Sequence, residues 1–326
     1  MPLTRCSPLA FALAPLFALF AVGACTASSP DAIDADVARE SEAARAAAYV
    51  DIETVLTPAQ TASWSTIRAG LVDDFDRICG DTFCGGDRSD LTSVRLRCSE
   101  SVKTHEIKAC TWVFGGSITG LDHAKGKLTG APHAFVCKIP ISATRDELLA
   151  DLAPAGSPTR LQRALPHSTT SIYDALGGCL SGVVVPKSGL EHGTGGYDHL
   201  NDSPATDIDR LNTLRWRIND AFASRCTDTF CAGDYTDFAP LSFDCGATST
   251  GVLGGCTWSF VGASLSVAKT TGSVTAKTEA KACQVVVHGT IGALLDALST
   301  DPKVDVLHQK LPGTNASLFD AIAPCL

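Results

Sequence analysis

The residues best suited to chemistry in this sequence are carboxylates clustered around one short motif. The motif Asp-Thr-Phe-Cys-x-Gly-Asp occurs twice, and another aspartate follows each copy three residues later. The six candidate ligands are Asp81, Asp87, Asp90, Asp228, Asp234 and Asp237. Carboxylates around a tight turn could bind Ca²⁺, which takes about six to eight oxygen ligands, or could form an acid–base pair for hydrolysis. A third interpretation is turn chemistry, in which the aspartates only accept hydrogen bonds from the backbone.

Other catalytic signals are weak. The eight histidines do not align with one another between the two halves of the sequence. His192 and His199 lie in a stretch rich in Gly and Asp, and we expect them to be exposed loop residues. The sequence has no nucleophile-elbow, phosphate-loop, dinucleotide-binding or zinc-protease motif. The sequence points to no catalytic residue, Ca²⁺ is the only cofactor that it suggests, and an enzyme is the less favoured class.

The spacing of the cysteines indicates an internal duplication of the sequence. Of 14 cysteines, twelve form two sets with matching spacing: Cys79, Cys84, Cys98, Cys110, Cys137 and Cys179, then Cys226, Cys231, Cys245, Cys256, Cys283 and Cys325. The first three pairs of equivalents are 147 residues apart and the last three are 146 apart. Neither set contains the CxxC spacing or a shared histidine that a zinc site would need. The pattern predicts two tandem, disulfide-bonded repeats of about 120 residues each.

Hydrophobic periodicity predicts the same elements in both copies. Each copy begins with apolar residues at helical spacing, which predict an amphipathic helix: Trp64, Ile67, Leu71 and Phe75 in the first copy, then Leu211, Leu214, Ile218 and Phe222 in the second. Alternating patterns then predict strands over 94–98, 110–114 and 135–141, with counterparts over 241–245, 256–260 and 283–287. Helices are expected over 145–152 and 291–298, and capping motifs predict further helices starting at Ser171 and Ser317. The order indicates an α+β fold with an antiparallel meander, which could be cystatin-like or NTF2-like by analogy.

A hairpin register follows from the cysteines. In a hairpin, the residue numbers of two directly opposed residues always add up to the same value. One such register pairs Cys98 with Cys110, Leu96 with Trp112, and Val94 with Phe114. The second copy repeats it with Cys245 opposite Cys256, Phe243 opposite Trp258, and Leu241 opposite Phe260. Opposed Cβ atoms are about 4.5–5.5 Å apart, close enough for disulfides after a small adjustment. We therefore predict Cys98–Cys110 and Cys245–Cys256, and we expect Trp112 and Trp258 in the core.

Four cysteines per copy remain, and they allow three pairings. We favour a small loop closed by neighbours, together with a bridge from the last strand to the end of the last helix. The preferred bonds are Cys79–Cys84, Cys137–Cys179, Cys226–Cys231 and Cys283–Cys325.

The N-terminus has the features of an export signal. Arg5 is the only charge in the first 24 residues, and an apolar run that is short for a transmembrane helix follows it. The run ends in Val22-Gly23-Ala24-Cys25, which resembles the lipobox of bacterial lipoproteins. The resemblance implies that residues 1–24 are removed and that Cys25 carries lipid. Thr26 in place of aspartate resembles outer-membrane sorting in Gram-negative families.

Composition and charge restrict the partners. The formal net charge is −9, without a basic tract, which argues against nucleic acid. The expected partners are the membrane, through the N-terminal lipid, and an unknown protein or glycan.

The segments divide the chain into a signal peptide (1–24), a lipid anchor and flexible tether (25–60), repeat domains 1 (61–180) and 2 (208–326), and a linker (181–207). The favoured function is binding or scaffolding by an exported, lipid-anchored envelope protein. The alternatives are an envelope hydrolase that uses the motif carboxylates and a protease-inhibitor-like module.

Overall fold

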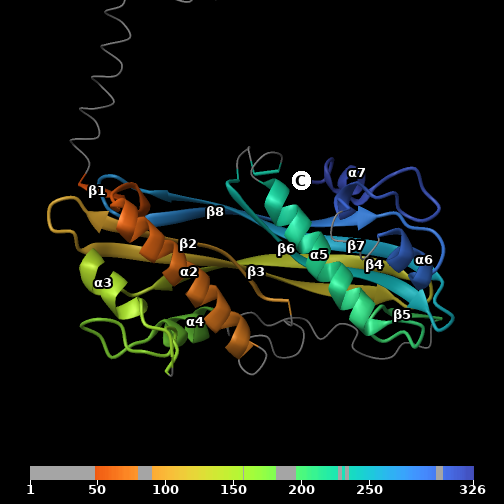
Figure 1. The fold of residues 1–326 in the computed structure, drawn as a ribbon, viewed down its shortest axis with the longest axis horizontal. Helices are drawn as coiled ribbons and strands as arrows, with labels where there is room; N and C mark the ends of the chain where they lie inside the picture. Colours follow the sequence, from red (N-terminus) through yellow and green to blue (C-terminus); the bar gives the residue numbers. More distant parts are fainter. Residues whose placement is uncertain are drawn as a thin grey trace, which may run out of the picture. The chain divides into compact units, whose positions relative to one another are not determined.

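Two antiparallel four-stranded sheets form the framework of the protein. The computed structural model describes residues 48–79, 90–156, 158–180, 196–226, 230–231, 235–298 and 304–326 (Figure 1). These residues belong to one compact unit. No helix in these ranges is both long and apolar enough to span a membrane. The structure is therefore mixed α+β, as the sequence predicts.

The first sheet has the strand order β1-β2-β3-β4 and is accompanied by three α-helices. Its elements are β1 (Tyr49–Asp51), the 3-10 turn η1 (Ile52–Thr54), α2 (Pro58–Cys79), β2 (Thr92–Ser101), β3 (Ile107–Asp122), β4 (Lys127–Ile139), α3 (Arg145–Leu152) and α4 (Ile172–Leu180). The predicted stripe of α2, from Trp64 to Phe75, is buried against this sheet together with Trp112. The apolar spacing of the sequence thus places α2 correctly.

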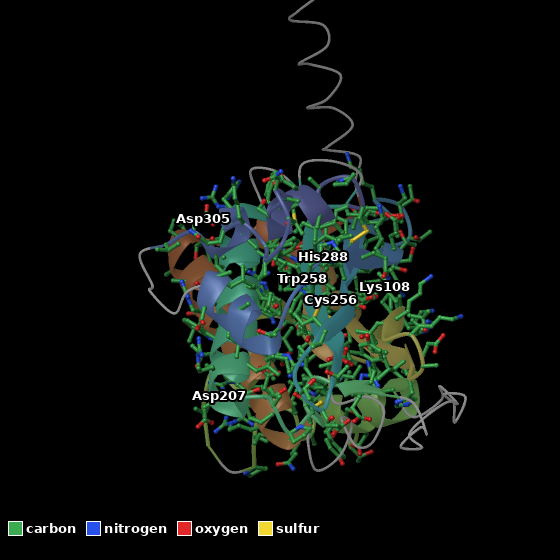
Figure 2. The ribbon with its side chains drawn as sticks, turned by 90° about the vertical axis from the view of Figure 1, so that its right-hand side faces the viewer. Lys108, Asp207, Cys256, Trp258, His288 and Asp305 are labelled. Carbon is green, nitrogen blue, oxygen red and sulfur yellow. A yellow bond between two sulfur atoms is a disulfide. The ribbon has the colours of Figure 1, made fainter. Side chains whose placement is uncertain are left out.

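The second sheet has the order β5-β6-β7-β8. Its elements are β5 (Tyr197–His199), α5 (Ile208–Cys226), β6 (Asp237–Thr248), β7 (Leu253–Val267), β8 (Val274–Val285), α6 (Ile291–Ala297), η3 (Val306–His308) and α7 (Leu318–Ile322). The stripe of α5, from Leu211 to Phe222, packs with Trp258 in a second core. Figure 2 shows Trp258 and Cys256 among packed side chains, whereas Asp207 and Asp305 lie at the edge.

The two sheets meet through the tips of their long hairpins. Tyr49 of β1 donates its backbone N–H to Lys269 beyond β7 at 3.0 Å, and Tyr197 of β5 donates to His123 beyond β3 at 3.1 Å. In Figure 1 the β7–β8 end accordingly reaches β1, and the β3–β4 end reaches β5. A small apolar cluster that includes Val113, Leu265 and Val274 lies between the sheets. Each half therefore covers part of the other.

Glycines at the hairpin tips permit this close approach. Gly126 has φ +64° and Gly272 has φ +71°, a region that favours glycine. A Cβ on Gly126 would lie 2.5 Å from the ring of Tyr197, and one on Gly272 would lie 2.6 Å from the ring of Tyr49. Larger residues at these positions would push the two halves apart.

Two predicted connecting segments are partly folded into the body. The tether was expected to extend to residue 60, but Tyr49–Asp51 pairs with β2 and Ile52 is fully buried. The linker was expected over 181–207, but Tyr197–His199 pairs with β6 and Leu200 is fully buried. Short edge strands with few apolar residues carry little periodic signal, and for this reason the sequence did not reveal them.

The predicted hairpin register is correct near the cysteines and wrong at its far end. Cys98 faces Cys110 and Leu96 faces Trp112, but Phe114 faces Ser93 rather than Val94. The second hairpin behaves likewise, with Phe260 opposite Pro240 rather than Leu241. A register shift consistent with a β-bulge separates the two parts of each pairing. A bulge inserts an extra residue into one strand, so the residue numbers of opposed residues no longer add up to the same value beyond it.

Candidate functional site

Ten of the described cysteines form five disulfides. They are Cys98–Cys110, Cys137–Cys179, Cys226–Cys231, Cys245–Cys256 and Cys283–Cys325, all of them pairs expected from the sequence. Cys84, the expected partner of Cys79, lies outside the described residues, as does Cys25. Disulfide sulfurs are not nucleophilic thiolates, so these ten cysteines hold elements together and perform no thiol chemistry.

Two of the six motif aspartates are described, and both bind to protein groups. Asp90 accepts hydrogen bonds from the Ser117 backbone N–H at 3.0 Å and from the Ser117 hydroxyl at 2.6 Å. Ser117 Oγ is also 2.6 Å from Ser242 Oγ of the second sheet. Burial raises the pKa of the Asp90 carboxyl. Asp90 thus supports the contact between β3 and β6.

Asp237, the counterpart of Asp90, makes a different contact between the halves. Its carboxylate lies 3.6 Å from the guanidinium of Arg95 on β2. Asp81, Asp87, Asp228 and Asp234 lie outside the described residues. Within the part of the chain that is described, no three His, Cys, Asp or Glu residues are grouped as metal ligands. Asp90 and Asp237 therefore contact protein groups, and neither belongs to a described group of three metal ligands.

A pocket of about 270 Å³ opens between α2 and β2. Ser65, Arg68, Ala69 and Val72 of α2 line one wall, and Ser93, Val94, Arg95 and Leu96 of β2 line the other, together with Trp112 of β3. Residues three and four apart share a helix face, which explains why these α2 positions point to the same space. Trp112 is 1% exposed and donates its indole N–H to Ser93 Oγ at 2.8 Å. The pocket thus combines an apolar base with polar walls.

Glu53 holds the two arginines of the pocket in place. Its carboxylate oxygens lie 2.8 Å from Arg68 Nη1 and 2.5 Å from Arg95 Nη2. The indole N–H of Trp64 also donates to Glu53 at 3.0 Å. Burial is the main cause that lowers the pKa of Arg68, while Glu53 acts in the opposite direction. Both guanidinium groups are therefore pre-positioned before any ligand arrives.

The hydrogen-bonding capacity of these arginines is not exhausted. The Nε atoms of Arg68 and Arg95 are buried and have no hydrogen-bond partner among the described residues, so only the terminal nitrogens of the two guanidinium groups can reach a ligand. A guanidinium group has five N–H donors, and Glu53 engages one terminal nitrogen of each arginine. Further donors remain on two groups that line the same pocket, which is an arrangement suited to a carboxylate.

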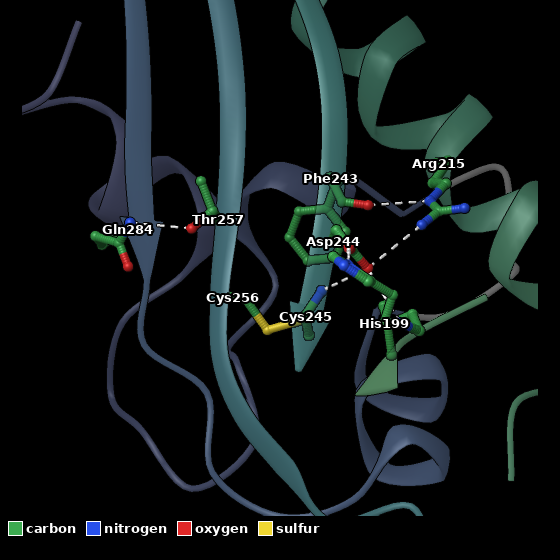
Figure 3. Close-up of a disulfide and its surroundings, with 9 residues drawn as sticks. His199, Arg215, Phe243, Asp244, Cys245, Cys256, Thr257 and Gln284 are labelled. Carbon is green, nitrogen blue, oxygen red and sulfur yellow. Dashed lines mark hydrogen bonds and ion pairs between the residues drawn. A yellow bond between two sulfur atoms is a disulfide. The ribbon is translucent and has the colours of Figure 1, made fainter. Parts of the chain in front are cut away.

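His199 is not the exposed loop residue that the sequence predicted. It lies in β5, where its Nδ1 is 2.5 Å from Asp244 Oδ2 on β6. Arg215 of α5 lies 3.8 Å from the other oxygen of Asp244. Figure 3 shows His199 and Arg215 both directed at Asp244 beside the Cys245–Cys256 disulfide. The hydrogen bond to Asp244 is the main cause that raises the pKa of His199; His192 lies outside the described residues.

Little in the amino-acid sequence points to the pocket. Arg68 and Arg95 stand on two separate elements, where isolated charges are typical of solvated faces, and Glu53 fell in the predicted tether. Of the lining residues, the sequence predicts Trp112 in the core, and its burial confirms that expectation; Val94 and Leu96 are predicted only as strand residues. The recurrence of tryptophan in both copies was the one usable signal for this region.

Comparisons of the chain with protein-family models, curated proteins and solved structures found no match. A function can therefore be inferred only from the chemistry of the described residues.

Proposed function

We propose that this chain is a bacterial lipoprotein that is exported, anchored to the outer membrane through Cys25, and binds a ligand in the cell envelope. The proposed localisation is supported by the export signal of residues 1–24 and by the lipobox-like sequence at its end. The five disulfides of the described body carry the proposed compartment, because such bonds persist in oxidising environments and are rare in the cytosol.

The body of this lipoprotein is, in our proposal, a tandem repeat of one α+β domain, related to cystatin-like or NTF2-like architecture. Matching cysteine spacing supports the repeat, as do the reciprocal contacts of Tyr49 and Tyr197. Duplication would place two related surfaces on one tether.

Binding is favoured over hydrolysis by the placement of the charged groups. Asp90 is hydrogen-bonded to Ser117, and Asp237 forms an ion pair with Arg95. The pocket between α2 and β2, by contrast, is lined by two arginines, of which Glu53 engages one terminal nitrogen each. Arginines fixed by a carboxylate recognise ligands without supplying an acid–base pair. The pocket is the single observation that carries the binding role. Ca²⁺ binding at the motif turns stays a prediction, and an unchanged melting temperature in Ca²⁺ would contradict it.

The proposed address can be tested on the mature N-terminus. Intact-mass and peptide mass spectrometry should find Cys25 as the first residue, carrying diacylglycerol. A Cys25→Ala variant should move from the membrane fraction to the soluble fraction. An unacylated mature N-terminus at another residue would contradict the lipid anchor.

The proposed binding role requires a separate experiment. The full chain, immobilised through a C-terminal tag, should retain a protein or glycan from envelope extract. Retention should be lost when the disulfides are reduced before loading. Equal retention by the native and the reduced chain would contradict specific binding by the folded body.

A further inference from the structure

We propose that the pocket between α2 and β2 binds a small monocarboxylate with an apolar group. This inference rests on the binding role proposed above and names the chemical class of the ligand. The class follows from three features of the pocket: its arginine donors, its apolar base and its volume.

The arginines define the charged end of the ligand. Arg68 and Arg95 converge on the pocket from α2 and β2, and Glu53 fixes both of them from behind. Asp237 stands 3.6 Å from Arg95, beyond ordinary hydrogen-bond distance. Glu53 and Asp237 offset most of the positive charge, so directed N–H donors rather than net charge would hold the ligand. A single carboxylate fits such donors, whereas a multiply charged phosphate would lack compensation.

The remaining walls define the apolar end. Val72, Leu96 and Trp112 supply apolar side chains to the lining of the pocket. Ser65 and Ser93 stand at its sides, and Ser93 is already bonded to the indole N–H. A volume of about 270 Å³ has room for about nine water-sized groups at roughly 30 Å³ each. An aromatic or short aliphatic acid matches this space.

Among the described residues of the second half, the positions equivalent to Arg68 and Arg95 do not form a two-arginine pocket. By the cysteine register, Arg215 corresponds to Arg68, but it bonds to the carbonyl of Phe243 and lies near Asp244. Ser242 stands where the first half has Arg95, and Trp216 stands where it has Ala69. The carboxylate site is therefore a property of the first half alone.

Phenylacetate, with about ten non-hydrogen atoms, is a suitable probe. Titration into the full-length, disulfide-bonded, ¹⁵N-labelled chain should shift the amide signals of Ser65, Ala69 and Ser93. We expect a Kd of about 1 mM, as is usual for ligands of this size. The neutral isostere phenylacetamide should bind about tenfold more weakly, because it lacks the charge-assisted hydrogen bonds.

Three variants separate the pocket from other surfaces. Arg68→Gln should weaken phenylacetate binding about tenfold, the loss expected for one charged hydrogen bond. Ala69→Leu should abolish binding by filling the pocket without removing any charge or hydrogen bond. Arg210→Gln is the matched control, because Arg210 is an arginine of α5 that pairs with Asp296 at 2.6 Å; its affinity should equal that of the wild type.

The inference is overturned if phenylacetate causes no shifts at these amides up to about 10 mM, or if Ala69→Leu binds it as well as the wild type. Retention of an envelope ligand by the same preparation would then show that the binding role stands and that only the assigned pocket is wrong.

Discussion

Equivalent residues in the two halves make the same contact with opposite charges. In the first half, Asp51 on the edge strand pairs with Arg97 at 3.1 Å. In the second half, His199 takes the position of Asp51, and Asp244 takes that of Arg97. The carboxylate lies on the edge strand in the first half and on the neighbouring strand in the second half. Its cationic partner is an arginine in the first pair and a histidine in the second. The second pair depends on a histidine that titrates near neutral pH.

Because of this difference, we predict that the contribution of the His199–Asp244 pair to the free energy of unfolding depends on pH near neutrality. Asp244 raises the pKa of His199 in the folded protein, so folding favours the protonated imidazole. The stabilisation is complete below the unfolded pKa of about 6.5 and is lost as the pH rises through the higher folded pKa. His199→Gln should reduce the free energy of unfolding by on the order of 1 kcal/mol at pH 5.5, and by less at pH 9. Urea unfolding across this range measures the difference, and a gap that widens with pH would contradict it.

A buried guanidinium binds the end of the first short helix in each half, although it comes from different positions. Arg160 donates through Nε to the Leu152 carbonyl at 2.9 Å and through Nη1 to Asp74 at 3.2 Å. Arg217 of α5 reaches the equivalent carbonyl of Leu298 at 3.4 Å. Unpaired carbonyls at a helix end need such donors. The requirement is met in both halves, but the residue that meets it has changed place.

The arrangement predicts an unusual effect of a glycine substitution. Gly70 lies inside α2, where alanine normally stabilises a helix by about 1 kcal/mol. Here an added Cβ would lie 2.6 Å from the Arg160 guanidinium, which is held on both sides. Gly70→Ala should therefore lower the free energy of unfolding by about 1–2 kcal/mol. Gly177→Ala in α4, where a Cβ would meet nothing within 4 Å, is the control; equal effects of the two changes would refute the steric explanation.

At the scale of elements, the disulfides differ in the length of chain that they restrain. Cys137–Cys179 ties β4 to α4 across 42 residues, whereas Cys98–Cys110 spans 12 within one hairpin. Loop entropy predicts that replacing both cysteines by alanine costs about 4 kcal/mol for the long loop and about 3 kcal/mol for the short one. Chemical denaturation of the two double variants tests this order. A larger loss for the hairpin variant would contradict it.

Sequence patterns predicted the helices better than the strands. The stripes of α2 and α5 each face one core, and Ser317 and Asp320 form the expected capping box of α7. The strands, however, extend well past the predicted segments. In the far part of β4, exposed and less exposed positions still alternate, but the less exposed ones are the small residues Gly130, Pro132 and Ala134. A Cβ on Gly130 would lie 2.8 Å from Ser259 Oγ of the other half. Small residues add little to a hydrophobic period, so the sequence pattern did not detect this part of the strand.

The candidate pocket could not be predicted for a different reason. It depends on Glu53, which reaches Arg68 on a helix and Arg95 on a strand. The three residues are distant in sequence and follow no common spacing. Only the pairing of β1 with β2 places Glu53 beneath them. Such a site becomes visible when tertiary structure brings isolated charges together.

At the scale of the whole molecule, each hairpin tip joins one half to the other. Gly126→Ala should weaken this contact, because its Cβ would lie 2.5 Å from the Tyr197 ring. Gly289→Ala is a matched control, since Gly289 also has positive φ but its nearest neighbour to a Cβ is 3.9 Å away. The backbone strain is about 1 kcal/mol for Gly126→Ala, in the left-handed region, and larger, about 1–3 kcal/mol, for Gly289→Ala at φ +114°, so the control is a stringent one. Gly126→Ala should lower the melting temperature further than the control does, and equal losses would argue against a tight interface.

The central claim is that the two halves form one folding unit, with the carboxylate pocket in the first half. Differential scanning calorimetry of the full, disulfide-bonded chain tests this claim most directly. Because each sheet is partly covered by the hairpin of the other, we predict one transition with equal calorimetric and van't Hoff enthalpies. Two resolved transitions, each with the enthalpy of about half the chain, would contradict it and would show that the halves are independent domains.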